Sequence, residues 1–393
     1  MTDSDVRRPP EVTASDVLAA QARLRRYLDV TPMHYAERFG CWLKLENLQR
    51  TGSYKVRGAM NALLAARERG DDRMVITASA GNHAQGLAWA AYRLGMPAIT
   101  VMPKNAPETK IAGVAHWGAA VRLHGDTYDE AKAFAAELAA QNGFRLLSAF
   151  DDVDVIAGQG TVGLEIAAAL TPDVVIVPIG GGGLASGVAL ALKSQGVRIV
   201  GAQVEGVDAM VRLLRGDDSV REPAVTLADG VRVKEPGHIT RHLLAGLLDD
   251  LVIVREAELR ETLVRLALEE HVIAEGAGAL ALAAGRRVAG KRKCAVVSGG
   301  NLDAAVLARL LSEVRPRPPR KPRRRVRETE AAQAVVAAPP LAVPRRRNDL
   351  AAAAVAATGE EPRLRRAALP ASAPTASPTP DRTPNRIPEE LPA

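Results

Sequence analysis

The segment KLENLQRTGSYKVRGA, residues 44–59, places one lysine, Lys55, between a Thr-Gly-Ser turn and the start of an expected helix. A lysine in such a place is most often a solvated surface residue. It does not fit a P-loop, because the pattern G-x-x-x-x-G-K-[ST] is absent. A third possibility is an amine held in a dry cleft with a lowered pKa, which could form a Schiff base with a carbonyl group. Lys55 is therefore a candidate catalytic residue.

A glycine cluster in DVVIVPIGGGGLASGVALALK, residues 173–193, follows an apolar strand and precedes an Ala/Leu-rich helix. Exposed backbone N–H groups and the helix dipole at that point suit a phosphate group, although a tight structural turn is the simpler alternative. A dinucleotide site is a rival, since Glu205 ends the next apolar run at about the spacing of a ribose-binding acid. The pattern Gly-x-Gly-x-x-Gly is not completed, because Ser186 stands at its last position. A phosphate cup is therefore favoured over NAD.

Two further strand ends carry small polar residues. In TASAGNHAQGLAWAA, residues 77–91, they cluster at the start of an amphipathic helix, which suits a carboxylate, with helix capping as the alternative. In CAVVSGGNLD, residues 294–303, the same pattern recurs, and a simple cap and turn again competes. A phosphate cup, a carboxylate cup and an amine are together what pyridoxal phosphate chemistry on an amino acid requires.

The elements that must position these residues alternate along residues 12–314. Short β-branched runs that end in Gly, Pro or Ser are separated by helical patterns, which predicts an α/β fold with a mostly parallel sheet covered on both faces. One helix is expected after Asp126 or Thr127 and should stop at Gly143. Ligands in such folds bind at the carboxyl ends of the strands, where the glycine and serine clusters lie.

The net charge of +7 over 393 residues belongs to the C-terminal segment. Residues 315–393 hold 16 Lys and Arg against 8 Asp and Glu, which leaves 36 against 37 for the rest. This Arg/Pro/Ala-rich tail has no aromatic residue and is predicted to be disordered. A polyanion or nucleic-acid binder acting through the tail is an alternative of another class, but it is not favoured because interleaved aromatics and a recognition fold are absent.

Export, membrane and metal signals are missing. The first residues, MTDSDVRRPPEV, contain no apolar core of a signal peptide, and no apolar run approaches the ~18 residues that span a bilayer, so a cytoplasmic protein is expected. Cys41 and Cys294 are too few for a disulfide scaffold and lack the spacing of a zinc site, so both are expected in the core.

Four motifs in order, LENLQRTGSYKVRGA, SAGNHAQG, GGGGL and SGGN, resemble the fold-type II pyridoxal-phosphate enzymes, and most closely the threonine/serine ammonia-lyases, also called threonine dehydratases. The resemblance covers residues 12–314. It implies a tryptophan-synthase-β-like architecture of two open, twisted, mostly parallel sheets flanked by helices. It also implies β-elimination of L-threonine or L-serine to ammonia and 2-oxobutanoate or pyruvate.

The resemblance also implies residue roles. Lys55 would form the Schiff base with the cofactor, Asn82 would contact the ring hydroxyl, and Ser298 would contact the pyridine nitrogen. The cofactor phosphate would be bound by Gly180, Gly181, Gly182, Gly183 and Leu184, and the substrate carboxylate by Ser79, Ala80, Gly81, Asn82 and His83.

Three departures from the family pattern bear on function. Tyr54 replaces the usual phenylalanine before the lysine, and Ala80 stands where racemases carry a second serine, which argues against racemisation. The racemase cation site, which would follow Glu205, is doubtful because Ala209 and Val211 occupy the positions concerned, and no metal is expected. Other enzymes of this fold, such as a 3-hydroxyaspartate dehydratase, a serine racemase or a β-replacement enzyme, stay as alternatives.

The resemblance further predicts how the chain is organised. Residues 12–66 and 147–314 would form a large cofactor-binding lobe, and residues 67–146 a small mobile lobe. The tail, residues 315–393, shows no recognisable regulatory domain. A homodimer or homotetramer with a small amino-acid substrate is expected, and the preference between threonine and serine stays open, as does a role in isoleucine biosynthesis or in amino-acid catabolism.

Overall fold

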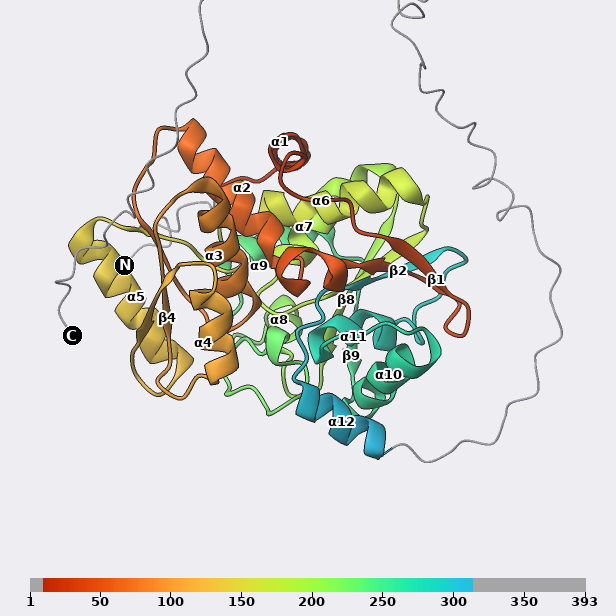
Figure 1. Ribbon diagram of the computed structural model, residues 1–393. Coiled ribbons are helices and arrows are strands. Elements are labelled where there is room, and N and C mark those ends of the chain that lie inside the picture. The colour runs from red at the N-terminus through yellow and green to blue at the C-terminus, as the bar shows by residue number, and fades with distance from the viewer. Residues whose placement is uncertain (1–9, 314–393) are drawn as a thin grey trace, which may run out of the picture. The chain divides into compact units, whose positions relative to one another are not determined.

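Two β-sheets organise residues 10–313, the part of the chain that the computed structural model describes (Figure 1). The larger sheet has six strands, and all neighbours pair in parallel except the first two. In spatial order they are β1 (Met33–Ala36), β2 (Cys41–Leu45), β10 (Lys293–Val297), β7 (Val174–Pro178), β8 (Arg198–Val204) and β9 (Asp250–Val254).

The smaller sheet has four parallel strands. In spatial order they are β5 (Ala120–Leu123), β4 (Ala98–Met102), β3 (Val75–Ala78) and β6 (Arg145–Leu146). All four come from residues 75–146. The predicted small lobe, residues 67–146, contains them, and its mobility stays a prediction.

Helices cover the two sheets (Figure 1). They are α1 (Ala14–Leu24), α2 (Lys55–Glu68), α3 (Asn82–Leu94), α4 (Glu108–Ala115), α5 (Tyr128–Asn142), α6 (Val153–Ala169), α7 (Gly183–Leu192), α8 (Ala209–Leu214), α9 (His238–Leu247), α10 (Glu256–Glu269), α11 (Gly276–Ala284) and α12 (Ala304–Ser312). The described residues also contain four short 3-10 turns: η1 (Glu46–Leu48), η2 (Arg50–Gly52), η3 (Lys193–Gln195) and η4 (Asp229–Val231).

The prediction of mostly parallel sheets is confirmed, and the physical reason is visible in the strands. Every residue of β3, β4 and β7 is buried, as expected for parallel strands covered by helices on both faces. Helix α11, with the sequence GAGALALAA, is buried on all sides because it carries no polar side chain.

Local signals also set the element ends. Helix α5 begins after Thr127, whose hydroxyl accepts from the N–H of Glu130 while the Glu130 carboxylate accepts from the N–H of Thr127. It ends at Gly143, which adopts a left-handed φ of 67°. The two boundary predictions for this helix are therefore confirmed, with Thr127 rather than Asp126 as the cap.

The topology brings the carboxyl ends of three strands to one edge of the larger sheet. Strand β10 lies between β2 and β7 and is parallel to both. The chain after β2 leads to Lys55, the chain after β10 begins with Ser298, and the chain after β7 runs into residues 180–183. Three of the four sequence motifs therefore meet at this edge.

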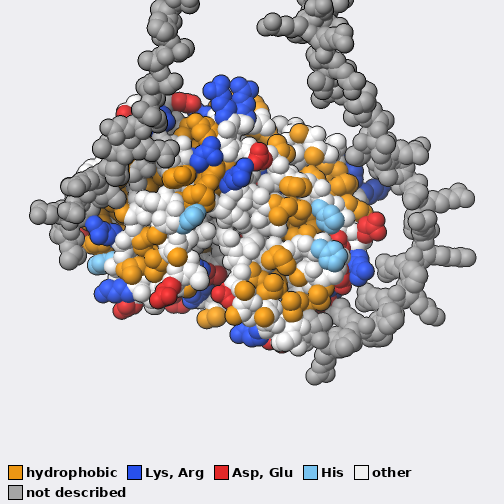
Figure 2. All heavy atoms as spheres, viewed as in Figure 1, with side chains coloured by type: hydrophobic (Ala, Val, Ile, Leu, Met, Phe, Trp, Pro, Cys, Tyr) orange, Lys and Arg blue, Asp and Glu red, His pale blue; other side chains and the backbone are white. Residues whose placement is uncertain are grey.

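The surface of the described residues agrees with the near-neutral charge counted for residues 1–314. On the face shown in Figure 2, basic and acidic side chains of the described residues are interspersed. Cys41 and Cys294 are both free and buried, as predicted. No helix within residues 10–313 is long and apolar enough to cross a membrane. The predicted disordered tail, residues 315–393, lies outside the described residues.

Candidate active site

Lys55 is the first residue of α2, reached through a sharp turn. Thr51 and Gly52 both adopt left-handed φ values, 61° and 71°, which redirect the chain from the sheet edge into the helix. The Lys55 Nζ atom donates a hydrogen bond to the carbonyl oxygen of Ala149 at 2.9 Å. Burial lowers the pKa of Lys55 to about 8, against the opposing effect of the Glu275 carboxylate. A fraction of this amine is thus neutral, and nucleophilic, near neutral pH.

The end of β10 is tied to the turn before Lys55. The backbone N–H of Tyr54 donates to the carbonyl oxygen of Ser298 at 3.1 Å, and the N–H of Gly300 donates to the carbonyl oxygen of Gly52 at 2.9 Å. Ser298 itself is only 2% exposed. The predicted pyridine partner and the predicted Schiff-base lysine therefore lie on two hydrogen-bonded segments.

The glycine cluster after β7, residues 180–183, forms a tight turn at the start of α7, which we call the glycine cradle. Gly182 adopts a left-handed φ of 98°. A Cβ atom on Gly181 would lie 2.3 Å from the ring of Phe150, and one on Gly183 would lie 2.9 Å from the Phe150 carbonyl oxygen. Glycine is therefore needed here, and the first N–H groups of α7 have no acceptor within their own helix. Because Phe150 follows Ala149, the cradle lies next to the residue that Lys55 contacts.

The start of α9 contacts the glycine cradle and holds it in place. One carboxylate oxygen of Asp151 accepts from the N–H groups of Ile239 at 2.9 Å and Thr240 at 3.2 Å, and the other accepts from His238 at 2.9 Å. The Thr240 hydroxyl then donates to the carbonyl oxygen of Gly181 at 2.6 Å. Asp151 thus fixes α9, and α9 fixes the cradle.

The SAGNH motif opens α3 at the carboxyl end of β3. Helix α3 packs closely on the start of α2, since a Cβ atom on Gly86 would lie 3.0 Å from the N atom of Val56. His83 is 2% exposed. Burial, and then the charge of Lys55, lower the pKa of His83 to about 3, so the imidazole is neutral. The positively polarised end of α3 therefore lies beside Lys55.

Asn82 directs its side chain across the site and not back onto α3. Its Nδ2 atom donates to Glu275 Oε1 at 2.7 Å, and its Oδ1 atom accepts from Asn301 Nδ2 at 2.8 Å. Asn301 also donates to the carbonyl oxygen of Thr51 at 2.8 Å. These bonds join the SAGNH and SGGN motifs to the turn that carries Lys55.

Glu275 is a candidate site residue that the sequence does not single out. It caps α11, and its N–H donates to the carbonyl oxygen of Gly299 at 3.0 Å. Burial raises the pKa of Glu275 to about 7, while the hydrogen bond from Asn82 opposes that shift. The available signal was a lone acid at the head of an otherwise apolar Gly/Ala helix.

The structure therefore brings all four sequence motifs together around Lys55. The remaining predicted substrate-loop residues lie beside Asn82: the N–H of Gly81 donates to Ser79 Oγ at 3.2 Å, and Ala80 packs on the neighbouring core. Within residues 10–313, no group of three or more His, Cys, Asp or Glu side chains could hold a metal ion. The site combines an amine of lowered pKa, two helix N-termini suited to anions and a buried acid.

Comparison with known proteins gives one consistent result. The family described as "Pyridoxal-phosphate dependent enzyme" matches residues 24–299. The L-threonine ammonia-lyase of Thermotoga maritima is 42% identical over 316 residues, which cover 77% of this chain and 79% of that protein. The catabolic L-threonine dehydratase of Escherichia coli is 39% identical over 315 residues, covering 76% and 96%. The solved structure of maize serine racemase is 30% identical, with a TM-score of 0.72, and the alignment covers 77% of this chain and 97% of that one.

Proposed function

The chain belongs to the family of pyridoxal-phosphate-dependent enzymes, and from that premise we propose that it converts L-threonine to 2-oxobutanoate and ammonia, and L-serine to pyruvate and ammonia. The observation that carries this proposal is the Lys55 amine, with its pKa lowered to about 8, between the glycine cradle and the start of α3. The names of the two relatives, which both contain L-threonine, support the choice of substrate.

The residues present fit the cofactor. Phe150 packs directly against Gly181 and Gly183, so a side chain at either position would disturb the turn, and the first N–H groups of α7 have no acceptor within their own helix and suit a phosphate group. A pKa of about 8, against an ordinary 10.5, raises the neutral fraction of Lys55 near pH 7 by roughly two orders of magnitude. When bound, pyridoxal phosphate supplies the electron sink that stabilises negative charge on the substrate α-carbon.

Each residue then has a defined task in the proposal. Lys55 holds the cofactor and, once the substrate amine has replaced it, accepts the α-proton at Nζ. The substrate carboxylate binds at the start of α3, at residues 79–83, and the cofactor phosphate at residues 180–184. Asn82 would contact the ring hydroxyl of the cofactor, and Ser298 would contact its ring nitrogen.

Two features support elimination over racemisation. Ser298 is a neutral partner for the ring nitrogen and does not favour its protonation as an aspartate would, which limits carbanion storage and favours prompt loss of the β-hydroxyl. Ala80 has no hydroxyl with which to protonate the opposite face of the substrate. The maize racemase is similar in fold, but the two relatives named for threonine are the more similar in sequence.

The test uses the purified full chain with pyridoxal phosphate. L-Threonine should yield equal amounts of 2-oxobutanoate and ammonia, and L-serine should yield pyruvate. D-Serine formation from L-serine, with little keto acid, would replace the proposal with a racemase. Keto acid from 3-hydroxyaspartate alone would replace it with the corresponding dehydratase.

We further propose that the protein works in the cytoplasm as a homodimer or homotetramer, with residues 67–146 closing on the substrate. The free, buried state of Cys41 and Cys294 fits a reducing compartment. Light scattering of the purified protein would give the mass of the assembly. A role in isoleucine biosynthesis would follow from growth of a threonine-dehydratase-deficient strain without isoleucine when this chain is supplied.

A further inference from the structure

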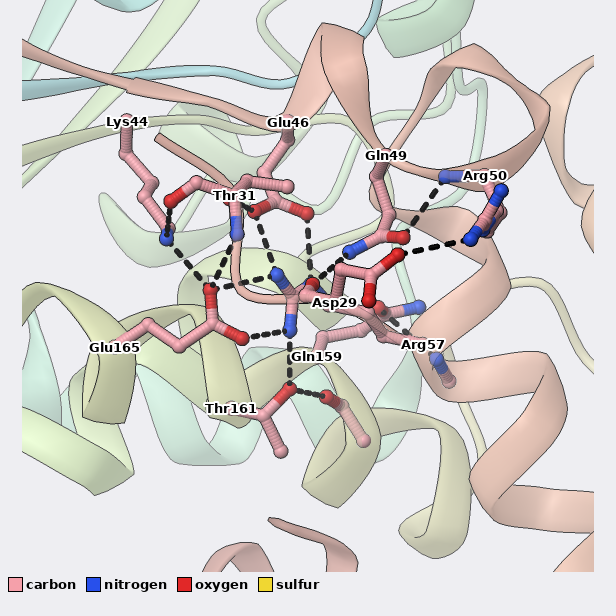
Figure 3. Close-up of polar contacts among 12 residues, drawn as sticks. Asp29, Thr31, Lys44, Glu46, Gln49, Arg50, Arg57, Gln159, Thr161 and Glu165 are labelled. Atoms are coloured by element: carbon pink, nitrogen blue, oxygen red, sulfur yellow. Dashed lines mark hydrogen bonds and ion pairs between the residues drawn. The ribbon is translucent and has the colours of Figure 1, made fainter. Parts of the chain in front are cut away.

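Four charged side chains converge in the interior of the protein (Figure 3). Lys44 and Glu46 are fully buried, and Arg57 is 1% exposed. The side chain of Glu165, from α6, is 10% exposed. We call these four residues the charge cluster. Two cations and two anions make its formal charge zero.

Arg57 is the centre of the charge cluster, and all five of its N–H donors are used. Two bonds of 2.7 and 2.8 Å go to the carboxylate of Glu46, and two of 2.6 and 2.8 Å go to that of Glu165. The fifth goes to Thr161 Oγ1 at 3.1 Å. Burial alone would lower the pKa of Arg57, but Glu46 and Glu165 raise it above its ordinary value. These paired bonds from the planar guanidinium, which we call the Arg57 fork, fix the orientation of both carboxylates as well as their distance from Arg57.

Glu165 is held equally firmly. It accepts from Lys44 Nζ at 2.6 Å and from the backbone N–H of Thr31 at 3.2 Å, besides its bonds to Arg57. The charge cluster thus ties the segment before β1, strand β2, helix α2 and helix α6 to one another. Because buried ion pairs often stabilise no better than apolar side chains of similar volume, stability alone does not account for it.

The charge cluster joins α2, which carries Lys55, to α6, which follows the segment that contains its partner Ala149. Arg57 lies two residues after Lys55 on α2. Helix α6 begins at Val153, immediately after the segment that contains Ala149 and Phe150. The position of α2 relative to α6 therefore decides where the Lys55 amine lies relative to Ala149.

Helix α6 also sets the distance to the glycine cradle, because it packs between α2 and α7 (Figure 1). On the α2 side, a Cβ atom on Gly158 would lie 2.7 Å from the Arg57 carbonyl oxygen. On the α7 side, a Cβ atom on Gly187 would lie 2.5 Å from the N atom of Gly160. The backbone of α6 is therefore in direct contact with the backbones of α2 and α7. A small shift of α6 would displace both Lys55, on α2, and the glycine cradle, before α7.

We propose that Arg57 and Glu165 are positioning residues, whose buried fork holds α2 on α6 and thereby sets the Lys55 amine at its working distance from the glycine cradle. The inference rests on the proposed role of Lys55 as the cofactor-bearing lysine. Within residues 44–59 it assigns a function to Arg57, and a supporting one to Glu46, which binds Arg57, and to Lys44, which binds Glu165.

The test compares two substitutions in the charge cluster with a control elsewhere, all in the full-length holoenzyme. Arg57→Lys keeps the positive charge but loses the fork, and Glu165→Gln keeps the volume but loses the negative charge. Leu310→Ala, in α12, removes a buried side chain far along the chain from α2 and α6 and serves as a matched destabilised control. For each variant we would measure the melting temperature, the visible circular dichroism of the bound cofactor, and kcat and KM for L-threonine.

Because a displacement of about 1 Å in a catalytic group can cost ~100-fold in rate, both cluster variants should lose about 10- to 100-fold in kcat, with a smaller change in KM. The visible circular dichroism should change with kcat, and Leu310→Ala should lower the melting temperature while leaving both unchanged. If either cluster variant does not fold, Thr161→Val should show the same changes at smaller size, because it removes one bond from Arg57 together with the bond from the Thr161 hydroxyl to the Gly158 carbonyl oxygen.

Wild-type cofactor dichroism and kcat in a folded Arg57→Lys or Thr161→Val protein would overturn the proposal. Equal changes in Leu310→Ala at an equal loss of melting temperature would also overturn it. If the wild type shows no activity on threonine, the dichroism comparison still decides the role of Arg57 and Glu165. Failure of the proposed function is thereby distinguished from failure of this inference.

Discussion

Asn82 donates a hydrogen bond to Glu275 over 2.7 Å, and this bond links the start of α3 to the start of α11 directly beside Lys55. The two residues are 193 positions apart in the chain. The bond holds a carboxyl group whose charge raises the pKa of Lys55, while burial of the amine lowers it to about 8. The reactivity of the amine is therefore set by a residue on a different helix.

Glu275→Gln should lower the pKa of Lys55 below about 8, because the substitution removes the negative charge that favours the ammonium form. The rate at which Lys55 reacts with an acylating reagent, followed by peptide mass spectrometry against pH in cofactor-free protein, measures this pKa. Glu258→Gln, in the first turn of α10, is the matched control and should leave the pKa of Lys55 where it is, because Glu258 pairs with Arg255 and Arg287. An unchanged or raised midpoint in Glu275→Gln would contradict the coupling.

The stability of the protein should depend on pH through the same carboxyl group. The pKa of Glu275 is raised from 4.5 to about 7 by burial, so the folded state binds the proton more tightly than the unfolded state. Its contribution to stability is present below about pH 4.5 and is lost as the pH rises through about 7. Denaturant unfolding should therefore show Glu275→Gln gaining stability relative to wild type between pH 5 and 7.5, at roughly those values. A constant difference over that range would contradict the raised pKa.

Gly181→Ala should abolish tight cofactor binding, because the added Cβ atom would lie 2.3 Å from the ring of Phe150. Overpacking of this kind costs about 1–3 kcal/mol, and here the strain falls on the cradle itself. Gly246→Ala in α9 is the control, since its Cβ atom would meet nothing within 4 Å. That control should stabilise the protein by about 0.5–1 kcal/mol and keep cofactor affinity. Fluorescence titration with pyridoxal phosphate measures the cofactor affinity of each variant. Equal affinities in the two variants would contradict a role of the glycine cradle in cofactor binding.

Asp151→Ala should weaken cofactor binding as well as stability. It removes the carboxylate that satisfies three N–H groups at the start of α9, and the same helix supplies the Thr240 hydroxyl to Gly181. The loss of such a cap costs about 1–2 kcal/mol. Thr127→Ala removes the cap of α5 at a similar cost in stability. It should lower the melting temperature without weakening cofactor binding. If Asp151→Ala leaves the cofactor dissociation constant unchanged, Asp151 does not stabilise the cofactor site through α9.

Much of the fold could be predicted from the sequence because its signals are local. The glycine and serine clusters mark strand ends, and the Thr127 and Gly143 signals mark both ends of α5. Parallel strands with apolar runs then bring Lys55, Ser298 and the glycine cradle to one edge. The resemblance to pyridoxal-phosphate enzymes is confirmed by the family match over residues 24–299. The individual residue roles stay predictions.

What the sequence could not indicate is long-range pairing of charged groups. Lys44 lies in a strand, and a lysine there is usually solvated, but its partner Glu165 is 121 positions away on α6. Glu275 resembles an ordinary acid at a helix start until Asn82 is placed against it. Ala149 and Phe150 carry no chemical signature, and only packing shows that one accepts from Lys55 and the other fits against Gly181.

The most direct test of the account is the Lys55→Ala substitution, measured by the visible absorbance of bound cofactor and by 2-oxobutanoate formation from L-threonine. Lys193→Ala, which removes an ion pair with Asp249 outside the site, is the control. We expect Lys55→Ala to lose both the absorbance band and the product while staying folded, and Lys193→Ala to retain both. A Lys55→Ala protein that keeps the band and forms 2-oxobutanoate would show that another group carries the chemistry.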